Sequence, residues 1–130
     1  YFYFNLVNIF GAIPLKLNPP INPEEVNKPK SSTEDVYAQI EKDLNDAIAV
    51  LETKYIGSDV GRATTGAAWG ILAKTFLYQG KWENALTAIA AVDALGLYNL
   101  QTVYKNSFID STQNNSESLL EIQHLSNQLP

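Results

Sequence analysis

The sequence predicts an all-α fold, made of antiparallel helical hairpins that are joined by long loops. Two stretches, residues 32–54 and 66–96, place apolar side chains at the three- and four-residue steps of a helix face. Glycines stand near the ends of these stretches, where a helix commonly stops. Five of the six prolines gather in residues 12–31, where they oppose helix formation.

Length and composition indicate one globular unit. The chain has 130 residues, and 45% of them are hydrophobic, which is enough for a small domain with a modest core. It opens on YFYFNLVNIF, without a methionine and in the middle of an apolar pattern. We therefore expect residues 1–130 to form a single partial domain, a fragment of a longer protein.

Charge and cysteine content exclude several classes of function. The formal net charge is −5, so no basic stripe is available to displace counterions from phosphates, and we expect no nucleic-acid partner. Polybasic attachment to an anionic membrane is disfavoured for the same reason. The chain has no cysteine, which excludes disulfides, thiolate metal sites and cysteine nucleophiles within it. No apolar run reaches the roughly 18 residues of a membrane-spanning helix.

The first 31 residues divide into a helix and a loop. In residues 1–10 the apolar positions recur at helical steps, which predicts the end of a helix closed by Gly11, with an edge strand as the alternative. Residues 12–31 form a Pro-rich loop in which we expect no helix, because proline lacks a donor and restricts the residue before it. A loop of this length is often functional, and a tethered surface crossing is the alternative.

Residues 32–54 give the clearest single helix. Ser32 followed by Asp35 resembles a capping box, with Asp in place of Glu. One face is apolar, comprising Val36, Ile40, Leu44, Ala47, Ile48 and Leu51. A loop over residues 55–65 follows, and we expect Thr64 or Thr65 to cap the next helix. Arg62 is expected to pair with a carboxylate of the preceding helix as a structural clamp, and a ligand contact is the alternative.

Residues 66–96 predict a helical hairpin. Gly80 interrupts two helical patterns and Lys81 fills a very short turn, so the two helices must be antiparallel neighbours. The predicted packing residues have the aromatic and small side chains of such a pair and are Trp69, Leu72, Ala73, Phe76, Gly80, Trp82 and Ala85. We expect Trp69 and Trp82 to be buried. This spacing resembles the tetratricopeptide repeat, except that Leu97 stands where the repeat usually has proline.

The C-terminal third is less regular. We expect an extended stretch over residues 98–100 and a short helical turn in TVYKNSF. A polar loop is expected over residues 110–117. In SLLEIQHLSNQLP, apolar and polar residues alternate, which favours a short C-terminal strand. The Leu, Glu and Gln content of this tail favours a helix instead.

No catalytic, metal-binding or cofactor-binding constellation is apparent. His124 is the only histidine and has no partner of catalytic type near it in the sequence, so a structural role is expected. The glycines at 66 and 70 lack the Lys-Ser/Thr of a phosphate loop. Acidic residues between 34 and 46 read as a solvated helix face. A carboxylate pair for glycosidic cleavage is left open by the sequence, but no residue is singled out for it.

Tyrosines in or beside loops are the candidate ligand contacts. Aromatic faces can stack on sugar rings, and Asn or Gln side chains can supply hydrogen bonds to them. Tyr55, Tyr98 and Tyr104 are free of the predicted helix packing and are therefore the candidate ligand-binding residues. The alternative is that they too are structural.

The order of segments resembles the SusD/RagB family over nearly the whole chain. Three groups of residues carry the resemblance: Leu6-Val7, Phe10-Gly11 and Pro14-Leu15; Ser32, Asp35-Val36-Tyr37, Ile40, Asp43-Leu44 and Ala47; and Gly61-Arg62-Ala63-Thr64, Ala67-Ala68, Leu72-Ala73, Leu77-Tyr78, Gly80-Lys81-Trp82, Ala85, Tyr98, Leu100, Tyr104, Phe108 and Asn115-Ser116-Glu117. The chain departs from the family's usual residues only at peripheral positions, namely Ala12, Lys30 and Leu51-Glu52.

The resemblance implies a function that the residues alone do not show. Members of this family are non-catalytic glycan-binding lipoproteins of the outer membrane, anchored by a lipidated N-terminal cysteine. They deliver glycans to a SusC-like TonB-dependent transporter, and their tetratricopeptide helices form the scaffold. The alternative function is a generic tetratricopeptide module that binds a protein or peptide. A polysaccharide-degrading enzyme is a third, less favoured, reading.

Overall fold

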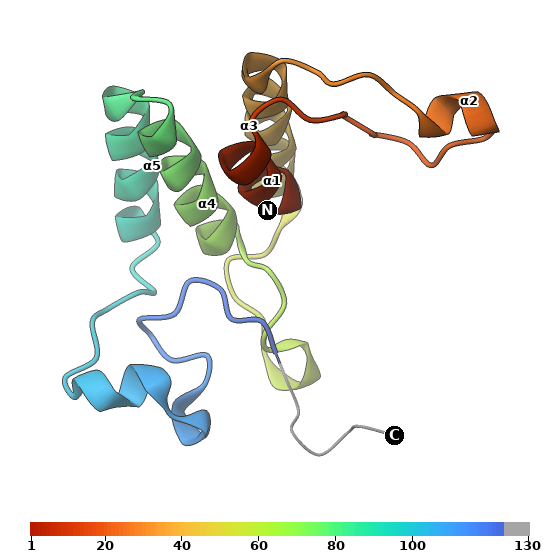
Figure 1. Cartoon of the computed structure of the whole chain (residues 1–130). Helices are drawn as coiled ribbons and strands as arrows, with labels where there is room; N and C mark the ends of the chain where they lie inside the picture. The colour runs from red at the N-terminus through yellow and green to blue at the C-terminus, as the bar shows by residue number, and fades with distance from the viewer. Residues whose placement is uncertain (124–130) are drawn as a thin grey trace.

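The computed structural model describes residues 1–123, and residues 124–130 lie outside this description. It is helical, as predicted (Figure 1). The α-helices are α1 (Phe2–Phe10), α2 (Pro23–Val26), α3 (Thr33–Val50), α4 (Thr65–Tyr78) and α5 (Trp82–Ala94). Short 3₁₀ turns follow at η1 (Gly57–Asp59), η2 (Tyr104–Phe108) and η3 (Asp110–Thr112). Within residues 1–123, the extended pairing is limited to an isolated bridge between Ile13 and Ser31.

Helix α4 lies at the centre of the helical layer. It packs against α3 on one side and α5 on the other, while α1 packs against α3 (Figure 1). The predicted hairpin is present as α4 and α5. Gly80 makes the turn between them with φ of 71°, a left-handed conformation that costs glycine little. The amide of Lys81 donates to the Phe76 carbonyl at 3.0 Å and completes the helix end.

The core lies where α1, α3 and α4 meet. Its buried members are aliphatic or aromatic side chains, comprising Phe4, Val7, Ile13, Leu15, Val36, Ile40, Leu44, Ala68 and Leu72. Val36 and Leu72 are almost completely excluded from solvent, with 0% and 1% exposure. Thr75 is fully buried as well, and its hydroxyl donates to the Ile71 carbonyl one turn earlier at 2.8 Å. The buried hydroxyl is therefore satisfied within its own helix.

The predicted packing residues of the hairpin are buried to different degrees. Leu72, Ala73 and Ala85 are buried, whereas Trp69 and Phe76 are half-buried and pack against the edge of the core. The expected burial of Trp82 is wrong, since this side chain is 62% exposed.

The exposure of Trp82 follows from the face that α5 presents to α4. The buried stripe of α5 runs through the small residues Ala85 and Ala88, which allow the two backbones to approach closely. Trp82 shares the neighbouring stripe with Leu86 and Ile89, which are 61% and 49% exposed. Periodicity identified the helix correctly. Because Trp82 is a large apolar residue, it was placed in the packing face, whereas the face of α5 that contacts α4 runs through the small residues Ala85 and Ala88.

The Pro-rich loop of residues 12–31 forms an arm that projects from the helices (Figure 1). At its base, the amide of Ser31 donates to the Ile13 carbonyl at 2.9 Å, and Ile13 and Leu15 are buried. The expectation that no helix forms here is wrong, because α2 begins at Pro23. Proline is tolerated in the first turn of a helix, where its missing N–H would have no intrahelical partner.

The helix starts agree with the predicted caps. The Ser32 hydroxyl accepts from the Asp35 amide at 3.1 Å, and the Thr64 hydroxyl accepts from the Ala67 amide at 3.2 Å. Helix α1 ends at Gly11, as expected. Arg62 does not pair with α3 as predicted. Its guanidinium lies 3.3 Å from Asp59, inside the loop that joins α3 to α4.

Residues 97–123 form an irregular segment beneath α4 and α5. The predicted helical turn near Tyr104 is present as η2. The predicted C-terminal strand does not form over residues 118–123, which have no regular structure. The rest of that predicted strand, and His124 with it, lie outside the described residues.

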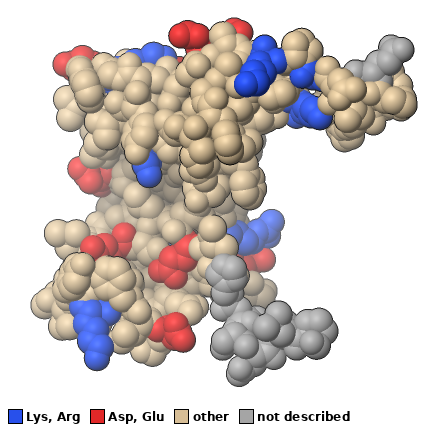
Figure 2. Space-filling model, in the orientation of Figure 1, with Lys and Arg blue, Asp and Glu red and all other residues tan. Residues whose placement is uncertain are grey.

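The visible surface carries mixed charge. Figure 2 shows Lys and Arg side chains gathered where the arm leaves the helices, and acidic side chains spread over the other parts of this face. Over residues 1–123, no helix has both the length and the apolar character needed to cross a membrane.

Candidate functional site

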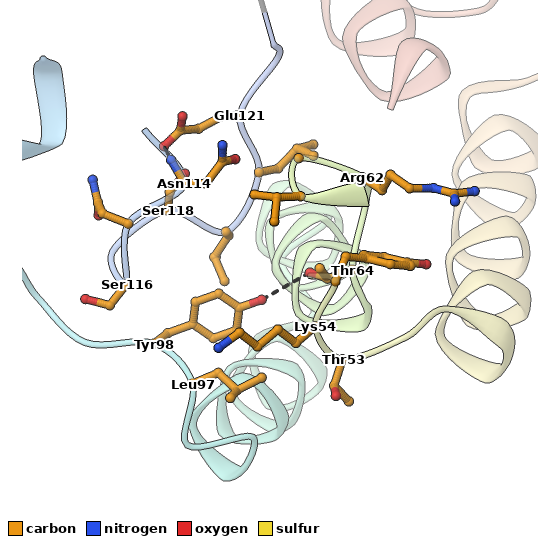
Figure 3. Close-up of a pocket in the computed structure, with 16 residues that line it drawn as sticks. Thr53, Lys54, Arg62, Thr64, Leu97, Tyr98, Asn114, Ser116, Ser118 and Glu121 are labelled. Atoms are coloured by element: carbon orange, nitrogen blue, oxygen red, sulfur yellow. Dashed lines mark hydrogen bonds between the residues drawn. The ribbon is translucent and has the colours of Figure 1, made fainter. Parts of the chain in front are cut away.

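A hollow of about 340 Å³ lies between the loop that precedes α4 and the C-terminal segment (Figure 3). Three stretches of chain line it: residues 53–64, residues 97–98 and residues 114–121. Because these stretches are far apart in sequence, the folding of the hairpin is what brings them together. We refer to this hollow as the loop pocket.

Tyr98 forms one wall of the loop pocket and is fixed against the start of α4. Its hydroxyl lies 3.1 Å from the Thr64 hydroxyl (Figure 3), which also caps the helix. The ring rests on Gly66, where a Cβ atom would come within 2.5 Å of Tyr98 Cε2. Glycine is therefore required at residue 66 for the tyrosine to take this position.

Tyr55, Lys54 and Arg62 supply a second wall from the loop after α3. The Arg62 guanidinium stacks over the Tyr55 ring, 5.4 Å from its centroid, while it also contacts Asp59. Figure 3 shows the Lys54 side chain reaching toward Tyr98, whereas the Arg62 guanidinium points away from Tyr98. Lys54 is therefore the cation of this wall that is directed into the pocket.

The third wall is a polar turn of the C-terminal segment. Asn114 takes a positive φ of 54°, a conformation that asparagine tolerates better than most residues. The Glu121 carboxylate accepts from the Asn114 amide at 2.9 Å. The Asn115 side chain accepts from the Glu117 amide at 2.9 Å and donates to the Thr112 carbonyl at 2.9 Å. This network holds the wall in one arrangement.

The structure brings together two of the three predicted ligand-binding residues. Tyr55 and Tyr98 both line the loop pocket. Tyr104 does not line it; this side chain is 77% exposed and packs on Phe108 with 5.0 Å between the ring centroids. Sequence reasoning did not single out Lys54, Asn114 or Glu121. The Asn114-Asn115 pair beside Ser116 was a usable signal, because consecutive amides in a polar loop often form defined turns.

The chemistry of the loop pocket suits a polyhydroxylated ligand. Tyrosine rings supply apolar surface, while amide, hydroxyl, ammonium and carboxylate groups supply donors and acceptors. The volume lies at the lower end of the roughly 300–1,000 Å³ of small-molecule pockets. The pocket can therefore enclose a small part of a chain-like ligand and leave the remainder outside.

Comparison with known proteins identifies the family. The model of a SusD-like family, described as "Starch-binding associating with outer membrane", matches residues 1–77. The chain belongs to the SusD-like family. A SusD-like protein of Bacteroides ovatus is 35% identical over 133 residues, which cover 93% of this chain and 24% of that protein. The chain thus spans about a quarter of the length of this relative.

Solved structures of SusD-like proteins share the fold. A laminarin-binding SusD-like protein superposes with a TM-score of 0.85 at 36% identity, over 92% of this chain and 27% of that one. A SusD-like carbohydrate-binding protein from Bacteroides fragilis gives a TM-score of 0.88 at 28% identity, over 95% and 25%. A structure described with xylogluco-oligosaccharide gives 0.77 at 34% identity, over 91% and 26%. Each of these similarities covers more than nine tenths of this chain.

Proposed function

We propose that this protein binds oligosaccharides without cleaving them. Membership of the SusD-like family is the observation that carries the proposal, because its model describes starch binding. Relatives named for laminarin or solved with xylogluco-oligosaccharide support it. The glycan is therefore expected to be a polymer of neutral sugars.

The loop pocket is the proposed contact site within this chain. Tyr55 and Tyr98 offer rings for the apolar face of a sugar, and Lys54 offers a donor that reaches toward Tyr98 (Figure 3). The wall formed by residues 114–121 offers amide and hydroxyl groups. Since the chain spans about a quarter of the relative from Bacteroides ovatus, other segments of the full-length protein are expected to complete the glycan contact.

The proposal extends to location and partner. We infer that the full-length protein is held at the outer membrane by an N-terminal lipid anchor and passes glycan to a SusC-like TonB-dependent transporter. The family's description as outer-membrane-associated supports the location. Co-purification of a large β-barrel protein with the tagged full-length protein from outer membranes tests the partnership. Recovery of the tagged protein in the soluble fraction alone would contradict it.

Calorimetry tests the binding proposal. The chain and the full-length protein are titrated with oligosaccharides from starch, laminarin and xyloglucan. We expect Tyr55→Ala and Lys54→Ala each to weaken binding of the recognised glycan severalfold, and Tyr1→Ala, an exposed tyrosine outside the pocket, to leave binding unchanged. Equal affinities for all variants would contradict the proposal that the loop pocket contacts the glycan. Release of new reducing ends during incubation would show cleavage and contradict the non-catalytic assignment.

A further inference from the structure

A second hollow, which we call the helix groove, lies over α4 between α3 and α5. Its volume is about 200 Å³, and it shares no lining residue with the loop pocket. Its lining combines aromatic, aliphatic and polar side chains, namely Asn45, Trp69, Leu72, Phe76, Glu83, Asn84, Thr87 and Ala88. Helix α4, which packs between α3 and α5, supplies Trp69, Leu72 and Phe76 to the floor, and its two neighbours supply the walls.

Two aromatic rings of α4 make the floor of the helix groove. Each ring has one part that packs against the core and another part that lines the groove, so neither Trp69 nor Phe76 is completely buried. Packing of this kind restricts the rotation of a side chain. The groove therefore presents aromatic surface in a fixed orientation, and little ordering entropy remains to be lost when a ligand contacts it.

Polar side chains along the walls have unused hydrogen-bonding capacity. Among residues 1–123, the side chains of Glu83 and Asn84 make no hydrogen bond or ion pair within the protein. The Asn45 amide donates to the Glu41 carbonyl at 2.7 Å, which leaves its side-chain oxygen as an acceptor. Donors and acceptors thus stand on both walls, above the aromatic floor.

A polar clamp holds the two walls together at one end of the helix groove. The Lys81 ammonium lies 2.5 Å from the Glu41 carboxylate and joins the α4–α5 turn to α3. The Gln79 side chain donates to the same carboxylate at 2.7 Å. Lys81 also lies 5.7 Å from the centroid of the Phe76 ring. The width of the groove is therefore set by contacts within the protein before any ligand binds.

We propose that the helix groove is a second carbohydrate subsite, which stacks one or two rings of a neutral glycan on Trp69 and hydrogen-bonds them through Asn84 and Glu83. This inference rests on the proposed glycan-binding function. Glu83 is the charged residue of the lining, so the groove repels a carboxylated sugar. Its volume lies below the roughly 300 Å³ at which drug-sized pockets begin, which restricts the contact to a short part of the chain.

The same features disfavour a helical peptide as the occupant. Helix-in-groove recognition requires long apolar anchors at successive turns and a continuous hydrophobic trough. The helix groove is short and has polar side chains on both walls, including Asn45, Glu83 and Asn84. Sugar hydroxyl groups match such walls, whereas an apolar peptide face would leave them unpaired.

Tryptophan fluorescence tests the inference, because the chain contains only two tryptophans. Trp82→Phe leaves Trp69 as the single reporter, and Trp82 is exposed and outside the groove lining. Starch, laminarin and xyloglucan oligosaccharides are titrated alongside an acidic control, oligogalacturonate. We expect a saturable change in Trp69 emission with a neutral glycan and none with the acidic one.

A matched pair of variants on α5 locates the contact. In the Trp82→Phe background, Asn84→Ala is expected to weaken the Trp69 response about two- to tenfold, as for the loss of one hydrogen bond. Asp93→Ala, at an exposed position of the same helix outside the groove, should leave it unchanged. Equal responses of the two variants would overturn the assignment of the groove.

The remaining outcomes separate this inference from the proposed function. Glycan binding seen by calorimetry while Trp69 emission stays constant would overturn the helix groove alone. Absence of a Trp69 response in this chain, together with absence of a calorimetric signal from the full-length protein, would overturn the proposed function together with the groove. A Trp69 response to an amphipathic helical peptide, without one to any glycan, would assign the groove to a peptide and contradict the carbohydrate subsite.

Discussion

The helical layer of α1, α3, α4 and α5 and the irregular segment 97–123 are stabilised by different interactions. The helical layer encloses fully buried side chains such as Val36 and Leu72. No residue from 97 to 123 is buried, and that segment is ordered by hydrogen bonds. The Asn99 amide donates to the Ser116 carbonyl at 2.9 Å, and Glu117 accepts from Gln101 and Ser107.

The difference shows how each region responds to change. Apolar burial is non-directional and distributed over many contacts, so the stability of the helical layer depends on how well its buried side chains fill the core. Hydrogen bonds require defined partners, so the stability of residues 97–123 depends on individual donor and acceptor atoms. The loop pocket lies on the boundary and is lined by the α3–α4 loop and by this segment. Its shape therefore requires both kinds of stabilisation.

The largest expected effect comes from the core of the helical layer. Leu72→Ala removes a side chain that is 1% exposed, and we expect a loss of about 2–5 kcal/mol in the free energy of unfolding, measured by urea denaturation. Leu86→Ala, at a position 61% exposed, is the matched control and should change stability by less than about 0.5 kcal/mol. Similar losses for both variants would show that the exposed stripe of α5 carries packing energy.

The boundary between the two regions is tested at Gly66. An exposed glycine within a helix is commonly improved by alanine, by about 0.5–1 kcal/mol. Here the added Cβ would overlap the Tyr98 ring, so we expect Gly66→Ala to destabilise the protein by about 1–3 kcal/mol in thermal or urea unfolding. In a Tyr98→Ala background the same substitution should become neutral or stabilising. An unchanged penalty in that background would place the obstruction elsewhere.

The caps of α3 and α4 differ in their further contacts. Ser32 caps α3 alone, whereas Thr64 caps α4 and also contacts the Tyr98 hydroxyl. Replacement of each by alanine should cost about 1 kcal/mol for the lost cap. Thr64→Ala should lower the free energy of unfolding somewhat more than Ser32→Ala does, because it also removes the contact with Tyr98. In a Tyr98→Phe background, most of this difference should disappear. If Ser32→Ala proves the more damaging in denaturation measurements, the link between Thr64 and Tyr98 contributes nothing to stability.

The smallest global effect is expected within the segment. Glu117→Gln keeps the shape of the side chain and removes the charge that accepts from the Gln101 amide and the Ser107 hydroxyl. We expect faster hydrogen exchange at Gln101, because charge-assisted bonds are stronger than neutral ones. Exchange in α3 should be unchanged. Accelerated exchange in α3 as well would mean that the two regions unfold together.

Sequence reasoning was most successful where local chemistry determines the structure. The periodicity and caps of α3 and α4 and the short turn at Gly80 were predicted correctly, because each depends on neighbouring residues. Burial of Ala85 was predicted correctly, but the exposure of Trp82 was missed, because the side of α5 that faces α4 depends on the partner helix. Helix α2 was missed because Pro23 stops a helix in the interior but not in its first turn.

The loop pocket was only partly predictable. Tyr55 and Tyr98 were singled out by their loop positions and do line the pocket, but nothing in the local sequence distinguishes them from Tyr104, which lies outside it. The contact between Tyr98 and Thr64 joins residues 34 positions apart, and only the three-dimensional arrangement shows it. Arg62 was assigned the wrong partner because Asp59, three residues earlier, was closer than any carboxylate of α3.

The base of the arm at residues 12–31 has a consequence for changes in chain length. Hydrogen bonding between Ile13 and Ser31, with Ile13 and Leu15 buried, fixes the two ends of the arm next to each other. The tip around α2 can then be lengthened without moving α1 or α3, since each doubling of a flexible loop costs only about 0.6 kcal/mol. The arm is thus a natural site for insertions, both as related sequences diverge and when an epitope is introduced by engineering.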